Sequence, residues 1–99
     1  MDNAVGPVLN ICGEVDGVLN AIADDNPGIE VEVIDRGGYL RVQAANTLSV
    51  TRDSLQRHLG PSFELPSFES MMSAFSGRIK TSPDKITWYL KSGTDDRVK

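Results

Sequence analysis

The spacing of apolar residues in the first part of the chain predicts a strand and then a helix. Residues 5–11 are mostly apolar and predict an extended segment. Pro7 favours an edge position for this strand, because proline has no backbone N–H to donate to a neighbour. Apolar residues then recur at i, i+3, i+4 and i+7, which predicts a helix of about three turns. These residues are Val15, Val18, Leu19 and Ile22, and the turn residues Pro27 and Gly28 end the helix.

Alternation of apolar and charged residues then predicts a β-hairpin. In residues 29–35 the apolar positions Ile29, Val31 and Val33 alternate with glutamates, which is typical of a half-buried strand with these three residues inward. A tight turn at 36–38 leads into a second strand with Leu40 and Val42 inward. A short extended piece, 48–50, follows the hairpin.

The second half of the chain predicts two helices and a final hairpin. Thr51 caps a helix over 51–59, Asp53 lies in its first turn, and Gly60 ends it. Ser67 caps another helix, which Gly77 ends. The apolar stripe of this second helix is Phe68, Met71, Met72 and Phe75. The last hairpin carries Ile86, Trp88 and Leu90 on one face.

This order of elements predicts an α+β fold. The elements run β-α-β-β and then β-α-α-β-β, with antiparallel hairpins packed against about three helices. Ninety-nine residues suit a single domain, 1–99, with an ordered core over about 5–91. We expect the polar ends, 1–4 and 92–99, to be frayed.

Composition and charge argue against several classes of function and location. The formal charge is −4, and the 10 basic residues are scattered, so the chain is not expected to bind nucleic acid. No apolar run is long enough to span a membrane, and the N-terminus lacks the pattern of a secretory signal. A single cysteine cannot form an internal disulfide. We therefore expect a reduced, cytoplasmic protein. The sequence gives no evidence for a dimer, and we expect a monomer when the chain is free.

The sequence offers no convincing catalytic or metal-binding group. Cys12 and His58 are the only thiol and imidazole, too few for a zinc site. Cys12 is expected to pack as a small hydrophobe and His58 to be a solvated helix residue. Gly37-Gly38 leads into a strand and not a helix, so it does not form a phosphate-binding loop. The residues by themselves therefore give no candidate for catalysis.

Two surface features have a neutral and a functional interpretation. Asp24 and Asp25 lie near the end of a helix, where they either terminate it and aid solubility or form a docking rim for a basic partner. The predicted third helix carries a row of small residues at helical spacing, Ser70, Ser73, Ala74 and Gly77. Such a row either tolerates exposure or contacts another protein, because it is uncharged and costs little to desolvate.

Short motifs along the chain resemble one family. They are VGP at 5–7, DNPG at 25–28, DRGGY at 35–39, LSVTRDSL at 48–55, LGPSFEL at 59–65 and FSGRI at 75–79. In this order they are similar to the effector, or coupling, proteins of soluble bacterial diiron monooxygenases. The resemblance covers about residues 5–90. VGP and DNPG are most similar to the toluene and alkene members.

The resemblance implies a cofactor-free protein that performs no chemistry. It would bind the diiron hydroxylase component, change its active-site conformation and couple electron transfer from NADH and O₂ activation to substrate oxidation. It would also compete with the electron-transfer protein for a surface. In methane-type members the segment just before a Gly-Arg pair contacts the hydroxylase, and the corresponding positions here are 73–76, where Phe75 replaces a small polar residue. The row of small residues overlaps this segment. The expected hydroxylase interface is Ser70, Ser73, Ala74, Phe75, Ser76, Gly77 and Arg78.

Two other classes of function remain open from the sequence. One is a regulatory α+β domain that binds a small ligand between sheet and helices, which a ligand-induced shift in melting temperature would reveal. The other is a small enzyme that uses Cys12 or His58. If activity survived the replacement of both residues, this class would be excluded. Fold by itself decides between none of these classes.

Overall fold

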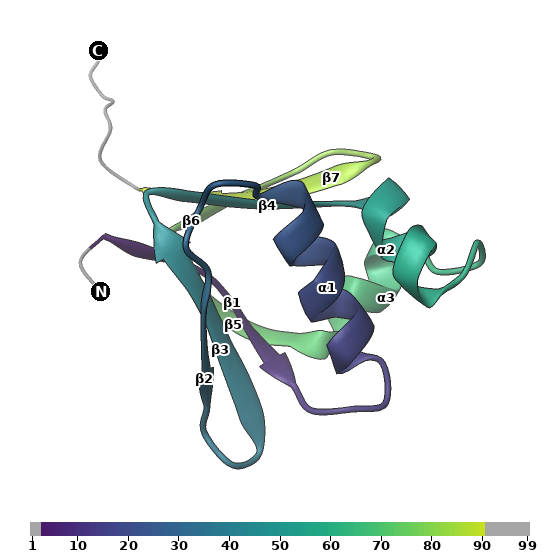
Figure 1. Ribbon diagram of the computed structural model, residues 1–99, viewed down its shortest axis with the longest axis horizontal. Helices are drawn as coiled ribbons and strands as arrows, with labels where there is room; N and C mark the ends of the chain where they lie inside the picture. The colour runs from purple at the N-terminus through teal and green to yellow at the C-terminus, as the bar shows by residue number, and fades with distance from the viewer. Residues whose placement is uncertain (1–2, 91–99) are drawn as a thin grey trace.

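Two antiparallel β-sheets and three helices make up the fold, which a computed structural model describes for residues 3–90 (Figure 1). Of the ends predicted to be frayed, residues 1–2 and 92–99 lie outside the described residues, whereas Ala4 begins β1 and pairs with Ala45, so the prediction is wrong at that position. The elements are β1 (Ala4–Asn10), α1 (Val15–Asp25), β2 (Glu32–Asp35), β3 (Tyr39–Ala45), β4 (Thr47–Thr51), α2 (Arg52–Leu59), α3 (Leu65–Met71), β5 (Met72–Ser76), β6 (Arg78–Thr81) and β7 (Lys85–Tyr89).

The strands form two sheets, and the predicted α+β class is confirmed. One sheet has the order β2-β3-β1-β5 and the other the order β4-β7-β6. Every strand pair is antiparallel. The chain passes from the first sheet to the second between β3 and β4 and again between β5 and β6. In Figure 1 α1 lies between the two sheets, with α2 and α3 beside it.

Strand β1 lies inside its sheet, so the edge position predicted from Pro7 is wrong. Val5 pairs with Ala44 of β3 and Val8 pairs with Arg41, whereas Gly6 and Pro7 pair only with β5. The missing N–H of Pro7 therefore falls where the β1–β3 ladder is interrupted. Gly6 has φ +142°, and a Cβ there would collide with the carbonyl oxygen of Val42. Glycine at this position lets the two strands approach closely.

The first hairpin is confirmed, but its first strand is shorter and less buried than predicted. Strand β2 begins only at Glu32, and Val31 is half-buried. Ile29 and Val33 are 38% and 44% exposed, so the prediction that both face the core is wrong. Because β2 is an edge strand of the first sheet, its inward side chains have neighbours on one side only.

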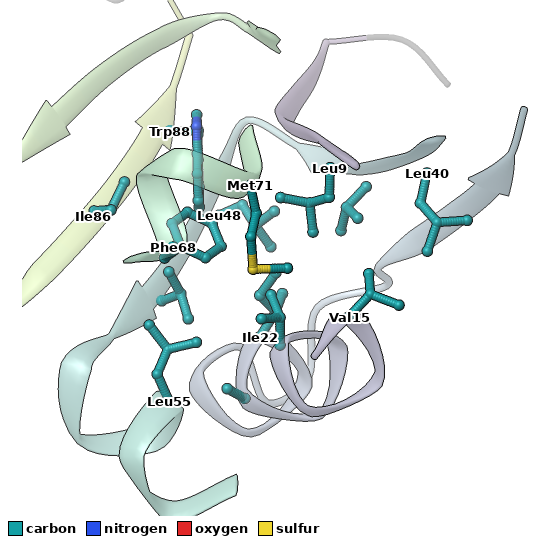
Figure 2. Packing of buried hydrophobic residues seen from close by; sticks show 14 of the residues in the cluster. Leu9, Val15, Ile22, Leu40, Leu48, Leu55, Phe68, Met71, Ile86 and Trp88 are labelled. Atoms are coloured by element: carbon teal, nitrogen blue, oxygen red, sulfur yellow. The ribbon is translucent and has the colours of Figure 1, made fainter. Parts of the chain in front are cut away.

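The core lies between the two sheets and the helices. Figure 2 shows Ile22 and Val15 of α1 directed toward Met71, Leu9 and Leu40, with Trp88, Phe68 and Leu48 close by. The rings of Phe68 and Trp88 meet edge to face, with centroids 5.9 Å apart. Ile86 and Trp88 are fully buried and Leu90 packs against the cluster, in agreement with the predicted last hairpin.

The third helix differs most from its prediction. Helix α3 begins after Glu64, so Ser67 is not its cap, and it ends at Met71. Residues 72–76 form β5, which pairs with β1 from Gly6 to Leu9. Phe68 and Met71 are core residues as predicted, but Phe75 is not part of a helical stripe. Without β5, the backbone of β1 would lack a partner on that side, and this pairing outweighs the local preference for helix.

A carboxylate at the end of α1 joins it to the start of α2. Asp25 accepts hydrogen bonds from the Thr51 backbone N–H at 2.7 Å and from the Ser54 hydroxyl at 2.6 Å. Thr51 is the N-cap of α2, as predicted, and its hydroxyl accepts from the Ser54 N–H. Asp25 is therefore neither a plain helix terminator nor an exposed docking rim.

Replacement of Asp25 by alanine is expected to lower the free energy of unfolding by about 2 kcal/mol, because it leaves a backbone N–H and a hydroxyl without their acceptor. Asp24 is the matched control. Its carboxylate is 44% exposed and bonds to Arg57 and His58, so Asp24→Ala is expected to cost less than about 1 kcal/mol. Urea denaturation of both variants tests this, and equal losses would contradict the assignment.

Candidate functional site

Cys12 and His58, the candidate reactive residues, are not assembled into a catalytic site. Cys12 is exposed in the loop before α1, so its predicted packing as a small hydrophobe is wrong. His58 is exposed on α2, as predicted for a solvated helix residue, and its Nε2 lies 2.6 Å from the Asp24 carboxylate. Within residues 3–90, no group of three or more His, Cys, Asp or Glu side chains could hold a metal ion.

The predicted interface residues lie together, but on a different scaffold from the one expected. Ser70 lies near the end of α3, residues 73–76 lie in β5, and Arg78 begins β6. They therefore do not form one face of a helix, and the predicted i, i+3, i+4, i+7 row does not exist. The segment instead runs along the outer strand of the first sheet and into the second sheet.

Strand β5 presents a small, uncharged surface. Ser73, Ala74 and Phe75 are exposed and Ser76 is half-buried. Only one side of β5 pairs with β1, so its other side is a free strand edge among the described residues. The ladder shifts register between Val8 and Leu9, and this irregularity leaves Ser73 near β1, with its hydroxyl 3.4 Å from the Val8 carbonyl oxygen. An exposed edge with small side chains is suited to close approach by another protein.

Phe75 is the large apolar side chain of this segment. It lies opposite Pro7 in the ladder and is 42% exposed. Phe68 and Met71 are buried in the core, whereas the Phe75 ring remains partly in water. An aromatic ring held on a strand among small residues can supply much of the binding energy of a contact.

Gly77 has a structural role between β5 and β6, and not the predicted role of ending a helix. Its φ is +86°, a conformation that residues with a side chain rarely adopt. A Cβ at this position would lie 2.6 Å from both the Tyr89 carbonyl oxygen and a methyl carbon of Val5. Glycine here allows the chain to cross between the sheets while touching both.

A hollow on the surface bears on the small-ligand alternative. It has a volume of about 460 Å³ and lies at the start of α2, where Thr51, Arg52 and Asp84 contribute to its lining. Two of its charged groups already have partners, because Asp25 bonds to Thr51 and Ser54 and Arg52 bonds to Glu64 at 2.8 Å. The hydrogen bond and charge of Glu64 raise the pKa of the Arg52 guanidinium, which stays protonated. This hollow is not the predicted site between sheet and helices, where apolar side chains fill the space.

The structure thus defines an α+β protein in which the candidate contact residues lie along an exposed strand edge. The chain belongs to the MmoB/DmpM family, whose model matches residues 3–89.

Individual relatives agree with this assignment. The chain is 43% identical over 91 residues to the effector subunit of the alkene monooxygenase system of Xanthobacter autotrophicus, covering 92% of this chain and 90% of that protein. The structure of the soluble methane monooxygenase regulatory protein B is similar with a TM-score of 0.72 and 27% identity, covering 98% of this chain and 72% of that one. A chain in the structure of a phenol hydroxylase–regulatory protein complex shares the fold, with a TM-score of 0.78 at 18% identity, covering 88% of this chain and 98% of that one.

These similarities confirm the family predicted from the short motifs. They also confirm that the chain is a regulatory, effector-type component and not a catalytic one. No helix within residues 3–90 has the length and apolar character needed to cross a membrane.

Proposed function

We propose that this chain is the effector subunit of an alkene-type monooxygenase and docks on its diiron hydroxylase component through β5. The observation that carries the proposal is the similarity to an alkene monooxygenase effector subunit along nearly the whole chain. The free edge of β5 supports the choice of docking surface. The proposed contact residues remain Ser70, Ser73, Ala74, Phe75, Ser76, Gly77 and Arg78.

The residues of this surface would make different contributions to docking. Ser73 and Ala74 permit close approach to the partner's helices, and Phe75 provides apolar contact area. Arg78, exposed at the start of β6, would pair with a hydroxylase carboxylate. Gly77 contributes by setting the path of the backbone between these residues.

The effector would act as a ligand with different affinities for two hydroxylase conformations. A ligand shifts such an equilibrium only by its difference in binding free energy between the two states. A coupling free energy of about 1–3 kcal/mol would change the favoured state by about 5–150-fold. By this shift the effector would couple NADH-derived electron transfer and O₂ activation to substrate oxidation. Its docking surface would overlap that of the electron-transfer protein, and it would act as a monomer in the cytoplasm.

A titration tests this function directly. The purified chain is added to a reconstituted hydroxylase with its electron-transfer proteins, and product formed is measured per NADH consumed. We expect a rise that saturates near one chain per hydroxylase active site, followed by inhibition at excess because the effector and the electron carrier share a surface. A flat response with a correctly folded chain would contradict the proposal.

A further inference from the structure

The outer face of the second sheet carries positive charge on an acidic protein. Side chains alternate along its strands, and the buried ones, Leu48, Val50, Ile86 and Trp88, face the core. The residues between them and their ladder partners face outward, and none of these outward residues is acidic. They are Thr47, Ser49, Thr51, Arg78, Lys80, Lys85, Thr87 and Tyr89. The whole chain has 14 acidic and 10 basic residues, so this face differs in sign from the molecule.

The two lysines of this face lie close together. Lys80 pairs with Thr87 across the ladder, and Lys85 is two residues from Thr87 on the same side of β7. Lys80, Ser82, Lys85 and Thr87 line a hollow of about 240 Å³. Like charges at neighbouring positions on a sheet are unfavourable without a counter-charge. The ion pairs within residues 3–90 involve Arg52, Arg57 and His58, and none involves Arg78, Lys80 or Lys85.

The same face is open and continuous with the proposed docking strand. In Figure 1 α1 lies below β4 and β7, and no described helix or strand lies above them. Arg78 begins β6 directly after Gly77, so the face starts where the β5 segment ends. Asp84 is the nearest carboxylate along the chain, and it accepts a hydrogen bond from Ser82 in the turn beside Lys85.

We propose that this cationic face, formed by Arg78, Lys80 and Lys85, binds a carboxylate-rich surface of the hydroxylase component, beside the contact made by β5. The inference rests on the proposed function, and it adds that the partner surface facing these residues is rich in carboxylates. An effector with a net charge of −4 would be repelled by an acidic partner unless its docking face were locally positive. The hollow lined by the two lysines would receive a carboxylate, with the two ammonium groups as its donors.

Charge reversal of single lysines tests the proposal. The affinity for the hydroxylase is measured for Lys80→Glu and Lys85→Glu at low and high salt, with Arg36→Glu as the matched control. Arg36 is exposed in the turn of the first hairpin, and its replacement changes the net charge equally. We expect each lysine variant to bind about tenfold more weakly at low salt and to show a smaller salt dependence, whereas Arg36→Glu stays within about twofold of wild type. Circular dichroism checks that all variants fold.

Each result has a distinct meaning. If the wild-type chain binds the hydroxylase but the lysine variants bind as Arg36→Glu does, the cationic face is not a contact and the inference is overturned. If the wild-type chain does not bind at all, the proposed function itself fails. Binding to anionic phosphatidylglycerol vesicles that is lost in Lys80→Glu, with unchanged hydroxylase affinity, would overturn the protein partner in favour of a lipid surface.

Discussion

Replacement of Ala74 by arginine is expected to abolish activation of the hydroxylase while the chain keeps its fold. Ala74 is exposed on β5 and lies opposite Val8 in the ladder. An arginine there would place a long charged side chain in a contact that depends on small, easily desolvated residues. In the titration of product formed per NADH, we expect the variant to leave the hydroxylase at its effector-free level.

Ala23→Arg is the matched control for this variant. Ala23 is an exposed residue of α1, which is not part of the proposed contact, so the same substitution there should leave activation unchanged. Thermal melting should show that both variants are as stable as wild type to within about 0.5 kcal/mol, as is usual for surface substitutions. Normal activation by a folded Ala74→Arg variant would remove β5 from the docking surface.

Replacement of Gly77 by alanine is expected to lower the free energy of unfolding by about 3 kcal/mol or more, because the new Cβ is strained at φ +86° and meets a backbone oxygen of β7. Gly38 is the matched control, since a Cβ there meets nothing within 4 Å and its φ is not positive. Urea denaturation of both variants gives the comparison.

The Gly77→Ala variant also distinguishes a role of Gly77 in the fold from a direct role in contact with the hydroxylase. If Gly77 acts by setting the backbone path, loss of activation should follow the loss of folded protein. Wild-type stability in the Gly77→Ala variant would show that the crossing between the sheets tolerates a side chain, and would contradict the role assigned to this residue.

Local sequence patterns were sufficient for most elements of the fold. Helix α1 and the Thr51-capped helix α2 follow from apolar spacing and capping, which act within a few residues. Both hairpins also follow from local turn residues and alternation, although β2 is shorter than predicted. The motifs that identify the family lie in these same segments, so the family could be predicted without the structure.

The candidate site was predicted by residue but not by geometry. Residues 68–75 satisfy a helical spacing by coincidence, and β5 has no clear alternation that would signal a strand. Strand β5 is selected by pairing with β1, which lies more than sixty positions earlier in the chain. The cationic face was also missed, because Arg78, Lys80 and Lys85 appear scattered until the β6–β7 ladder brings them together.

The sequence by itself therefore determined the class of fold, the family and the stretch of residues proposed for docking. Only the tertiary structure decided that this stretch is a strand edge, that Phe75 is exposed and that Asp25 joins two helices. The physical reason is the range of the interactions. Capping, turns and periodic burial act between near neighbours, whereas strand pairing and side-chain burial depend on residues that meet only when the chain has folded.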